Sequence, residues 1–553
     1  MLRTTRTLAL LTLPALALLT ASGCGGSDDP DPATTSNASS KRGGDFTGTY
    51  SSFPDYLDPA LAYTQEAWTT LWPVYTGLLT YKHAEGVAGS ELEPGLAEAM
   101  PEVSDDGLTY TLKLRSGLKY SDGSAVKASD FEHTIKRVLN LESGASGYYL
   151  AIEGAEDYVK AGKPSGDISG IETDDATGAI TIKLAAKDAQ FPYYLAMDFA
   201  GLVKGDTPFE NATSDPAVGV GPYEITAVKA NRSVTLTRNP NFAALPNVPE
   251  GRADSITRTA VKNQRRESQD VLSDKVDFMI DPPTTDQIRA IKADAPERYE
   301  EEPINSTYYF FLNQKVKPFD DERVRQAVGF AVDERAIARL FGGLLTPSCN
   351  FLPPDVAGFK KIDPCPWGEA GTADLEKAKA LIKEAGAEGA SVKVWGISGE
   401  PTEPVTEYLA DTLNQIGLDA KPTILDGSVF FQTVGNAKTK AQTGFANWFQ
   451  DFPSAANFMF LVDGASIQPT NNQNFGNVDD PELDTLIAAA KANPDPKAAA
   501  GDWAKADQLL IDKAYVVPYG SRLLTKFTSS RVDFDGFLFH PVNAQDLTTL
   551  GLK

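Results

Sequence analysis

The stretch PGLAEAMPEVSDDGLTYTLKLRSGLKYSDGSAVKASDFEHTIKRVL occupies residues 94–139 and contains a clear strand signal. Apolar side chains stand at every second position of residues 108–114, where they alternate with threonine and lysine. Such alternation predicts a β-strand with one buried face, because successive side chains of a strand point to opposite sides. Residues 179–185 and 233–238 repeat the pattern, and glycine, aspartate and asparagine turns bound these segments.

Helical signals alternate with the strand signals. In residues 372–386, TADLEKAKALIKEAG, the apolar side chains recur at the spacing of one helix face: Leu375, Ala378, Ile382 and Ala385. Thr372 is the expected N-cap of this helix and Gly386 its expected C-cap. Residues 321–341 predict two helices, of which the second starts at Asp333. Helices between strands indicate a mixed α/β fold.

The length and composition of the chain limit the class of protein to which it can belong. With 553 residues it is too long for one ordinary hydrophobic core, so we expect two or three domains. Hydrophobic residues make up 42% and charged residues 23% of the chain, which is typical of a soluble globular protein. The formal net charge of −24 disfavours nucleic acid and anionic lipid surfaces as partners, because both repel an acidic protein.

Residues 1–23 have the features of a secretory signal peptide. Two arginines precede an apolar run at residues 8–19 that is too short for a comfortable membrane span. The Ala-Ser-Gly-Cys sequence that follows resembles the bacterial lipobox, in which the cysteine, here Cys24, is lipidated and becomes the new N-terminus. Residues 24–44 have low complexity, and we expect them to be a flexible linker behind the lipid anchor. The alternative is an ordinary signal peptide that happens to hold a cysteine.

The other two cysteines, Cys349 and Cys365, lie sixteen positions apart in a proline-rich loop. In an exported, oxidising setting we expect them to form a disulfide, which stabilises the protein by about 3 kcal/mol in the chain-entropy model. A metal site or a catalytic thiol is the alternative, and neither has a nearby histidine in the sequence.

The sequence lacks most enzyme signatures. The three histidines, His83, His133 and His540, have no partners at metal-ligand or catalytic-triad spacing. No complete dinucleotide fingerprint, phosphate loop, calcium loop or nucleophile elbow is present. The sequence does not exclude a pair of carboxylates that catalyses glycoside hydrolysis, because with 75 acidic residues some pairs occur by chance. We therefore expect no catalytic residues, no metal and no cofactor.

Four stretches resemble one protein family, and they follow the family's order along the chain. Residues 57–79 resemble its opening Asp-Pro segment, and residues 94–139 resemble its block Leu-Arg-x-Gly-x-x-x-Ser-Asp-Gly followed by Ala-x-Asp and a helix. Residues 218–242 are similar to its Gly-Pro-Tyr strand, and residues 312–337 to its Pro-Phe-Asp and Asp-Arg helix pair. The family is that of the bacterial extracellular solute-binding proteins of family 5, the oligopeptide- and dipeptide-binding receptors of ABC importers.

The resemblance implies an α/β protein with the two-lobed periplasmic-binding-protein fold, type II-like, and an extra subdomain inserted in lobe I. Two crossing strands near Ser306 and Val516 are expected to form the hinge, and ligand contacts to both lobes would stabilise closure. The order of the blocks assigns residues 45–78, 190–305 and 510–553 to lobe I, 79–189 to the inserted subdomain, and 306–509 to lobe II.

The segment NWFQDFPSAANFMF, residues 447–460, holds one carboxylate, Asp451, among aromatic side chains and without a basic residue. A buried carboxylate is costly unless it is paired, so we expect its positive partner to come from a ligand. In peptide-binding family members an aspartate in a Gly-Trp-x-x-Asp-Tyr segment pairs with the α-ammonium of the peptide, and the resemblance gives this role to Asp451. The alternative is that Asp451 caps the turn into a helix near Ser454, with the aromatic residues in the core.

The resemblance also implies further ligand contacts. Residues 447–449 are expected to offer backbone groups to an extended peptide, and Trp448 to wall a side-chain pocket. Asn447 and Phe452 depart from the glycine and tyrosine of the family pattern. The expected substrate-binding residues are Asp451, Trp448, Asn447, Phe449, Phe452, Tyr148, Tyr149 and Trp68.

We expect a substrate-binding lipoprotein of an ABC importer that captures peptides between its lobes and delivers them to the membrane permease. Its partners would be the peptide, the permease subunits and the membrane through the lipid anchor, with no nucleic acid, and the protein would be a monomer. It would be exported and anchored at the outer face of the cytoplasmic membrane. The alternatives within the family are a non-peptide solute such as an oligosaccharide, an opine-like compound or a nickel chelate. Outside the family, the alternative is a secreted lipoprotein hydrolase.

Overall fold

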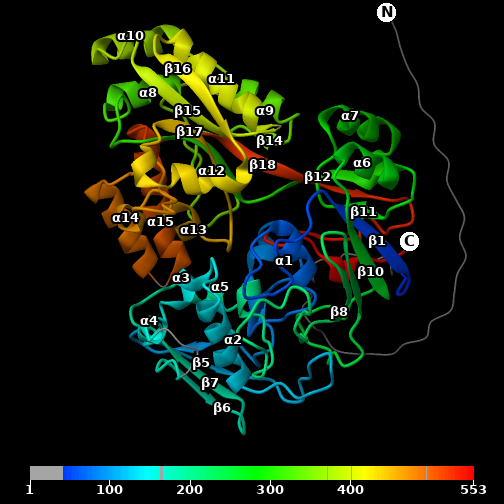
Figure 1. Cartoon of the computed structure of the whole chain (residues 1–553). Helices are drawn as coiled ribbons and strands as arrows, with labels where there is room; N and C mark the ends of the chain where they lie inside the picture. Colours follow the sequence, from blue (N-terminus) through cyan, green and yellow to red (C-terminus); the bar gives the residue numbers. More distant parts are fainter. Residues whose placement is uncertain (1–40, 162–165, 370, 400, 494) are drawn as a thin grey trace, which may run out of the picture. The chain divides into compact units, whose positions relative to one another are not determined.

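Figure 1 shows the computed structural model of the chain, which describes residues 41–161, 166–369, 371–399, 401–493 and 495–553. The expected signal peptide, the lipidation site Cys24 and the linker up to residue 40 lie outside the described residues. Within the described part of the chain, no helix is both long enough and apolar enough to cross a membrane. The described residues belong to one compact unit.

The main sheet joins strands from both ends and the middle of the chain. Its strands lie in the order β16 (Asp419–Leu425), β15 (Ser391–Ile397), β17 (Thr443–Phe449), β13 (Ser306–Leu312), β18 (Val516–Thr528), β11 (Phe278–Met279), β1 (Asp45–Tyr50), β10 (Ser255–Ala260), β9 (Ser233–Arg238) and β8 (Tyr223–Lys229). Two more strands, β12 (Tyr299–Pro303) and β14 (Leu345–Thr346), pair with β18 beside this path.

Strand β18 connects the two halves of this sheet. Its residues 516–520 pair antiparallel with β13, and its residues 523–527 pair antiparallel with β12. The chain passes between the same halves a second time where β12 ends and β13 begins. Strands β13 and β18 start at Ser306 and Val516, the positions expected for the crossing strands. The bounds of the lobes themselves stay a prediction.

A second sheet has four strands, in the order β4 (Glu102–Val103), β5 (Thr109–Lys113), β7 (Ala179–Lys183) and β6 (Ile171–Asp174). It falls within the range expected for the inserted subdomain, and all its neighbours are antiparallel. Tyr110 and Leu112 of β5 are buried, whereas Thr111 and Lys113 are exposed, as the alternation requires. The strands expected at residues 108–114, 179–185 and 233–238 are confirmed as β5, β7 and β9. Two short ladders pair β2 (Leu79–Tyr81) with β3 (Leu92–Pro94) and β19 (Phe539–His540) with β20 (Ala544–Gln545).

Helices cover the sheets, and Figure 1 shows α8, α10 and α11 beside the end of the main sheet that β15 and β16 form. The α-helices of the described chain are α1 (Gln65–Leu71), α2 (Ser129–Asn140), α3 (Ser146–Tyr149), α4 (Ala155–Lys160), α5 (Phe191–Tyr194), α6 (Gln264–Leu272), α7 (Thr285–Asp294), α8 (Glu322–Ala331), α9 (Glu334–Leu340), α10 (Leu375–Ala385), α11 (Thr402–Gln415), α12 (Gly427–Val434), α13 (Ala456–Met459), α14 (Pro481–Ala492) and α15 (Pro496–Asp512).

The two helices expected in residues 321–341 are confirmed as α8 and α9. Asp321 caps α8 by accepting a hydrogen bond from the backbone N–H of Arg323 at 2.9 Å. Asp333 caps α9 by accepting one from the backbone N–H of Ala336 at 2.9 Å. Both aspartates satisfy amides that the first turn of a helix leaves without intrahelical partners.

The start of α10 corrects one expectation. Asp374, not Thr372, is the N-cap, because its carboxylate accepts the backbone N–H of Lys377 at 2.9 Å. The hydroxyl of Thr372 instead donates to the carbonyl oxygen of Glu369 at 2.5 Å. The C-cap is Gly386, as expected, with a left-handed φ of 67° that glycine adopts without strain.

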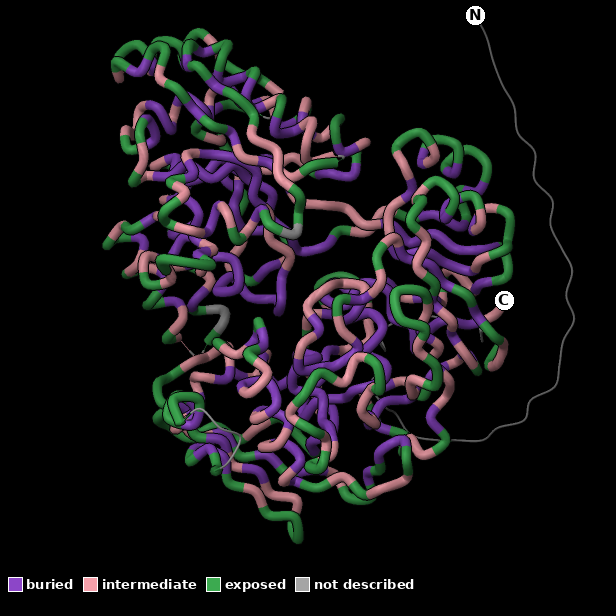
Figure 2. Tube along the Cα trace, in the orientation of Figure 1, coloured by how far each residue is buried: buried purple, intermediate pink, exposed green. Residues whose placement is uncertain are grey.

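The hydrophobic core divides into two large clusters. The first core cluster gathers buried side chains from residues 46–278 and 532–550, together with Phe452. The second core cluster gathers buried side chains from residues 308–519. Figure 2 colours the buried residues of the chain purple. Two separate cores joined by crossing strands form the two-lobed α/β fold.

Candidate ligand-binding site

The end of β17 determines where Asp451 lies. Strand β17 pairs antiparallel with β13 along its whole length and ends at Phe449. Just beyond the strand, Gln450 donates its backbone N–H to the carbonyl oxygen of Asn305 at 3.1 Å. Its side-chain Nε2 donates to the carbonyl oxygen of Pro541 at 3.0 Å. These bonds fix the chain immediately before the aspartate.

Three donors converge on one carboxylate oxygen of Asp451, a residue that is 4% exposed. Oδ2 accepts hydrogen bonds from the hydroxyl of Tyr63 at 3.0 Å, from the hydroxyl of Tyr148, and from Nδ2 of Asn457 at 3.2 Å. Oδ1 accepts no hydrogen bond from any residue that the structure describes. The carboxylate is therefore held through one oxygen and has the other left for a further donor.

Asn457, near the start of α13, joins Asp451 to the neighbouring tryptophan. Its Oδ1 accepts the backbone N–H of Asp451 at 2.7 Å and the indole N–H of Trp448 at 3.1 Å. Its Nδ2 is the donor to Asp451 Oδ2, and it lies 3.5 Å from the hydroxyl of Tyr148. One buried amide thus orients both the carboxylate and the indole ring.

No lysine, arginine or histidine of the described chain forms an ion pair with Asp451. Burial raises the pKa of Asp451 above its ordinary value, and the hydrogen bonds from Tyr148, Asn457 and Tyr63 oppose this rise. Burial, and then the charge of Asp451, raise the pKa of Tyr63 and of Tyr148 well above 10, so both hydroxyls stay protonated donors. The local environment therefore leaves the charge of Asp451 incompletely compensated.

The capping alternative for Asp451 finds no support in this geometry. Its carboxylate accepts no backbone N–H from the described residues, and the N-cap position of α13 is Ala455, without a side-chain cap. The hydroxyl of Ser454 instead accepts the backbone N–H of Ala456 at 3.3 Å. Asp451 does not start the helix.

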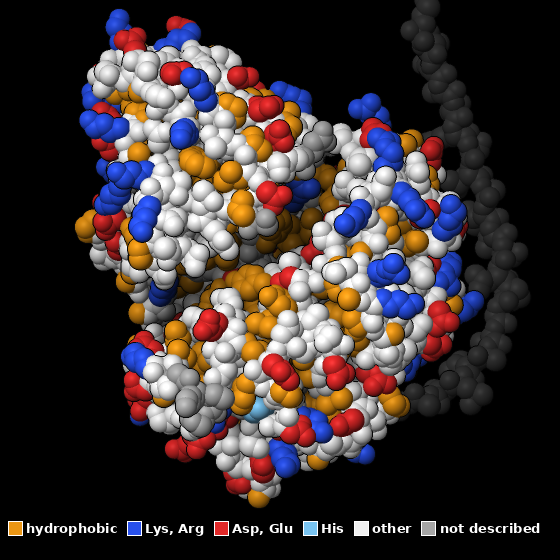
Figure 3. Space-filling model, in the orientation of Figure 1, with side chains coloured by type: hydrophobic (Ala, Val, Ile, Leu, Met, Phe, Trp, Pro, Cys, Tyr) orange, Lys and Arg blue, Asp and Glu red, His pale blue; other side chains and the backbone are white. Residues whose placement is uncertain are grey.

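A cavity of about 390 Å³ opens beside this carboxylate. Its lining comes from α1 and from Tyr63, two residues before that helix, from α12, from β17 with the residues after it, from Gln473 in the segment between α13 and α14, and from β18. The lining residues are Tyr63, Gln65, Trp68, Phe431, Asn447, Trp448, Phe449, Gln450, Asp451, Gln473 and Leu524. Asp451 is the one charged residue in this set. An apolar cavity of this size with a few polar groups is typical of a small-molecule site. Figure 3 shows hydrophobic side chains, in orange, gathered in a hollow on the face drawn.

The sequence profile described as "Bacterial extracellular solute-binding proteins, family 5 Middle" matches residues 91–469. The chain belongs to this family. The members of family 5 are solute-binding proteins rather than enzymes, which agrees with the absence of enzyme motifs from the sequence. Proteins of this family bind their solutes outside the cytoplasm.

Two relatives of this family 5 protein cover nearly all of it. The dipeptide-binding protein DppE of Bacillus subtilis is 26% identical over 522 residues, which are 89% of this chain and 89% of DppE. Heme-binding protein A of Haemophilus influenzae is 26% identical over 538 residues, which are 92% of this chain and 93% of that protein. Among solved structures, clavulanic acid biosynthesis oligopeptide binding protein 2 superposes with a TM-score of 0.86 and 24% identity over 93% of this chain and 96% of its own. This likeness establishes the two-lobed fold.

The structure brings most of the expected substrate-binding residues of this family 5 protein to the cavity. Trp68, Asn447, Trp448, Phe449 and Asp451 line it. The indole N–H of Trp68 donates to the carbonyl oxygen of Ala62 at 2.9 Å, which fixes the ring. Tyr148 does not line the cavity but reaches Asp451 through its hydroxyl.

Two expected residues lie away from the cavity. Phe452 packs into the first core cluster, with ring-centroid distances of 5.6 Å to Tyr193 and 5.3 Å to Tyr194. Tyr149 is fully buried, and its hydroxyl donates to the carbonyl oxygen of Tyr194 at 2.8 Å. Both side chains therefore pack in the interior rather than facing this cavity.

Several residues of the site carried no usable signal in the sequence. Tyr63 lies within the opening segment at residues 57–79, and Asn457 within PSAANF at residues 453–458, but nothing in the sequence indicates that either side chain reaches Asp451. The other lining residues that sequence reasoning missed are Gln65, Phe431, Gln450, Gln473 and Leu524. Gln450 directly precedes Asp451 in the chain, and the other four are brought to the cavity by the fold alone.

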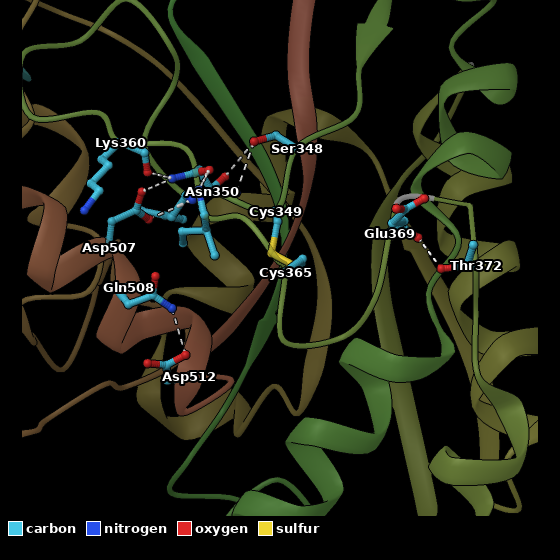
Figure 4. The surroundings of a disulfide bond; sticks show 12 residues. Ser348, Cys349, Asn350, Lys360, Cys365, Glu369, Thr372, Asp507, Gln508 and Asp512 are labelled. Carbon is cyan, nitrogen blue, oxygen red and sulfur yellow. Dashed lines mark hydrogen bonds between the residues drawn. A yellow bond between two sulfur atoms is a disulfide. The ribbon is translucent and has the colours of Figure 1, made fainter.

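The disulfide region is separate from this site. Cys349 and Cys365 are bonded, with an S–S distance of 2.07 Å. Figure 4 shows Asn350 beside the bond, where its Nδ2 donates to the buried carboxylate of Asp507 at 2.8 Å. Burial raises the pKa of Asp507 to about 7. Among the residues described, no group of three or more His, Cys, Asp and Glu side chains is arranged to hold a metal ion.

Proposed function

We propose that this family 5 protein is the substrate-binding protein of an ABC importer and that it captures peptides with a free N-terminus. The names of DppE, a dipeptide-binding protein, and of the structurally similar oligopeptide binding protein support a peptide ligand. The observation that carries the proposal is the buried carboxylate of Asp451, which has no basic partner in the described chain and one oxygen without a protein donor.

The α-ammonium group of a peptide is the partner that suits this carboxylate. A buried ion pair is favourable only when its remaining lone pairs are satisfied, and the three hydrogen bonds on Oδ2 supply that condition. An N-acylated peptide brings no positive charge and leaves Asp451 unpaired, at a cost of about 3–5 kcal/mol. The site therefore selects peptides whose N-terminus is free.

The backbone of β17 supports binding of an extended peptide. Strand β15 pairs with β17 at Thr443 and Gly444, so among the described residues β13 is the one strand that pairs with residues 445–449. An extended peptide adds to such an edge through main-chain hydrogen bonds, which are independent of its side chains. Asn447, Trp448 and Phe449 lie both on this edge and in the cavity lining. This arrangement favours a receptor that accepts many peptide sequences.

We also propose the anchoring and delivery that the sequence suggests. Cys24 carries lipid at the outer face of the cytoplasmic membrane, residues 24–44 link it to the lobes, and the monomeric receptor delivers its peptide to the permease. The lobes are assigned to the residue ranges given above, with the hinge near Ser306 and Val516. Cys24→Ala is expected to release the protein into the soluble fraction, and a variant still retained by the membrane would remove the anchor from the proposal.

An oligosaccharide is the second candidate ligand. Trp68 and Trp448 in the cavity lining provide surfaces for sugar rings, and Gln65, Gln450 and Gln473 provide amide groups for hydroxyls. A neutral sugar nevertheless leaves the charge of Asp451 without a partner, which is why a peptide is preferred.

The proposal is tested with a pool of di- to pentapeptides and the same pool after N-acetylation. A ligand that binds only the folded state raises its melting temperature, so the free-amine pool is expected to stabilise the protein and the acetylated pool is not. Native mass spectrometry then identifies the bound peptides and checks that they are intact. Equal stabilisation by both pools, or stabilisation by oligosaccharides alone, would refute the proposed ligand, and cleaved peptides would indicate a hydrolase.

A further inference from the structure

The side-chain amide of Asn457 contacts three residues of the site, although Asn457 itself does not line the cavity. It is 2% exposed and bonds to two groups of Asp451, to the indole of Trp448, and at 3.5 Å to the hydroxyl of Tyr148. Its side chain is thus placed to act on the ligand only through its neighbours.

Helix formation does not account for this asparagine. Asn457 is the second residue of α13, where asparagine is a weak helix former, and the N-cap position belongs to Ala455 without a side-chain cap. Its side chain turns toward Asp451 instead of toward the helix amides. The contacts to Asp451 and Trp448 are what this residue contributes.

We propose that Asn457 is a positioning residue that fixes the Asp451 carboxylate with Oδ2 toward the protein and Oδ1 toward the ligand, and that sets the Trp448 ring against the same cavity. The inference rests on the proposed function, because it assigns the orientation that lets Asp451 distinguish a primary ammonium from an acylated amine. Asn457 and its two partners lie within residues 448–457, on β17, α13 and the segment between them.

The contacts of Asn457 differ in kind from those of the two tyrosines. Tyr63 and Tyr148 pack against the first core cluster, whereas Trp448 packs against the second core cluster. The bonds from Asn457 to Asp451 and Trp448 therefore stay within one local segment and do not depend on the approach of the lobes. Asn457 keeps Asp451 oriented before a ligand arrives, and the tyrosine hydroxyls add to that orientation when the lobes are together.

The experiment replaces Asn457 and a matched asparagine in parallel. Asn350→Leu is the control, since Asn350 is also buried and also donates to a buried aspartate, Asp507, and neither residue lines the cavity. Asn457→Leu, with Asn457→Ser as the smaller replacement if the leucine variant does not fold, is expected to reduce the affinity for the tightest free-amine peptide of the pool about tenfold, as loss of buried hydrogen bonds to a charged group does. The affinity for its N-acetylated form is expected to stay unchanged, so the selectivity ratio falls. The control keeps that ratio.

A second measurement needs no ligand. In ¹H–¹⁵N spectra the indole resonance of Trp448, assigned with Trp448→Phe, is expected to shift in Asn457→Leu and in Asn457→Ser. It is expected to return toward its wild-type position in Asn457→Asp, which retains an acceptor oxygen for the indole. An unshifted indole, or a selectivity ratio unchanged from wild type, would overturn the positioning role. If the wild type binds no free-amine peptide, the proposed function fails, while the indole resonance still decides whether Asn457 holds Trp448.

Discussion

The substitution Asp451→Asn separates a ligand-binding carboxylate from a structural one. In the ligand-free protein, burial raises the pKa of Asp451 despite three hydrogen bonds, so the surroundings favour the neutral carboxyl more than water does. Asparagine has the same shape, is neutral, and its carbonyl oxygen accepts the bonds of Tyr63, Tyr148 and Asn457. The variant is therefore expected to be no less stable than the wild type at pH 7.

The pH dependence of this comparison has a definite sign. Because the folded-state pKa of Asp451 lies above its unfolded value, its contribution to stability is fully present below the unfolded pKa and is lost as the pH rises through the folded pKa. The asparagine variant has no such loss. The stability of the wild type relative to Asp451→Asn is therefore expected to decrease from about pH 4 toward neutral pH.

The same substitution, Asp451→Asn, is expected to weaken the binding of free-amine peptides. Removing one partner of a buried ion pair costs about 3–5 kcal/mol, which corresponds to an affinity loss of about 10²- to 10⁴-fold for a free-amine peptide. Calorimetry with free-amine and N-acetylated peptides measures this loss, and urea denaturation of protein freed of ligand measures the stability. A variant that loses several kcal/mol of stability without ligand, or that binds free-amine peptides as tightly as the wild type, would refute the reasoning.

Other substitutions test the remaining parts of the structure. Tyr148→Phe removes one donor from Asp451 and is expected to weaken free-amine binding about tenfold, which calorimetry measures; unchanged affinity would contradict the contact. Replacing both Cys349 and Cys365 by serine is expected to lower the free energy of unfolding by about 3 kcal/mol in urea titration, and no change would argue against a disulfide in solution. The guanidinium of Arg137 donates to the carboxylate of Asp58 at 2.8 and 2.9 Å in a fully buried pair. Arg137→Met leaves this carboxylate without its partner and is expected to lower the free energy of unfolding by about 3–5 kcal/mol. A melting temperature close to that of the wild type would contradict this prediction.

The elements that the sequence predicts best are those whose signal is local. Residues 108–114 form β5 because their alternating pattern places the apolar side chains on one face of a strand and the polar ones on the other, so only one face has to be buried. The cap of α10 shows the limit of this reasoning. Thr372 and Asp374 both have a short polar side chain, and the backbone path, not the residue type, decides that Asp374 faces the free amides of the first turn.

The candidate site could be predicted only in part, because its contacts are non-local. Asp451 is recognisable from its own aromatic segment, but Tyr63, which donates to it, lies 388 positions away in the chain. Tyr148 and Tyr149 differ by one position in the short helix α3, where neighbouring side chains point in different directions. One therefore reaches Asp451 while the other bonds to the carbonyl oxygen of Tyr194 in the core. No periodicity in the sequence distinguishes the two.

Under the proposed function, the donors around Asp451 would link the charge of the ligand to closure of the lobes. Tyr63 and Tyr148 come from segments packed on the first core cluster, and Asp451 follows a strand packed in the second. An ammonium on Oδ1 keeps Asp451 ionised, and hydrogen bonds to an ionised oxygen are about twice as strong as neutral ones. If Asp451 binds the ammonium of a peptide as proposed, the bound peptide is expected to strengthen the tyrosine bonds from Tyr63 and Tyr148 without touching either bond. With a ligand that carries no positive charge, Asp451 has no charged partner, and burial raises its pKa and so opposes the ionised form. Such a ligand is therefore expected to stabilise the closed state less than a free-amine peptide that makes the same number of direct contacts.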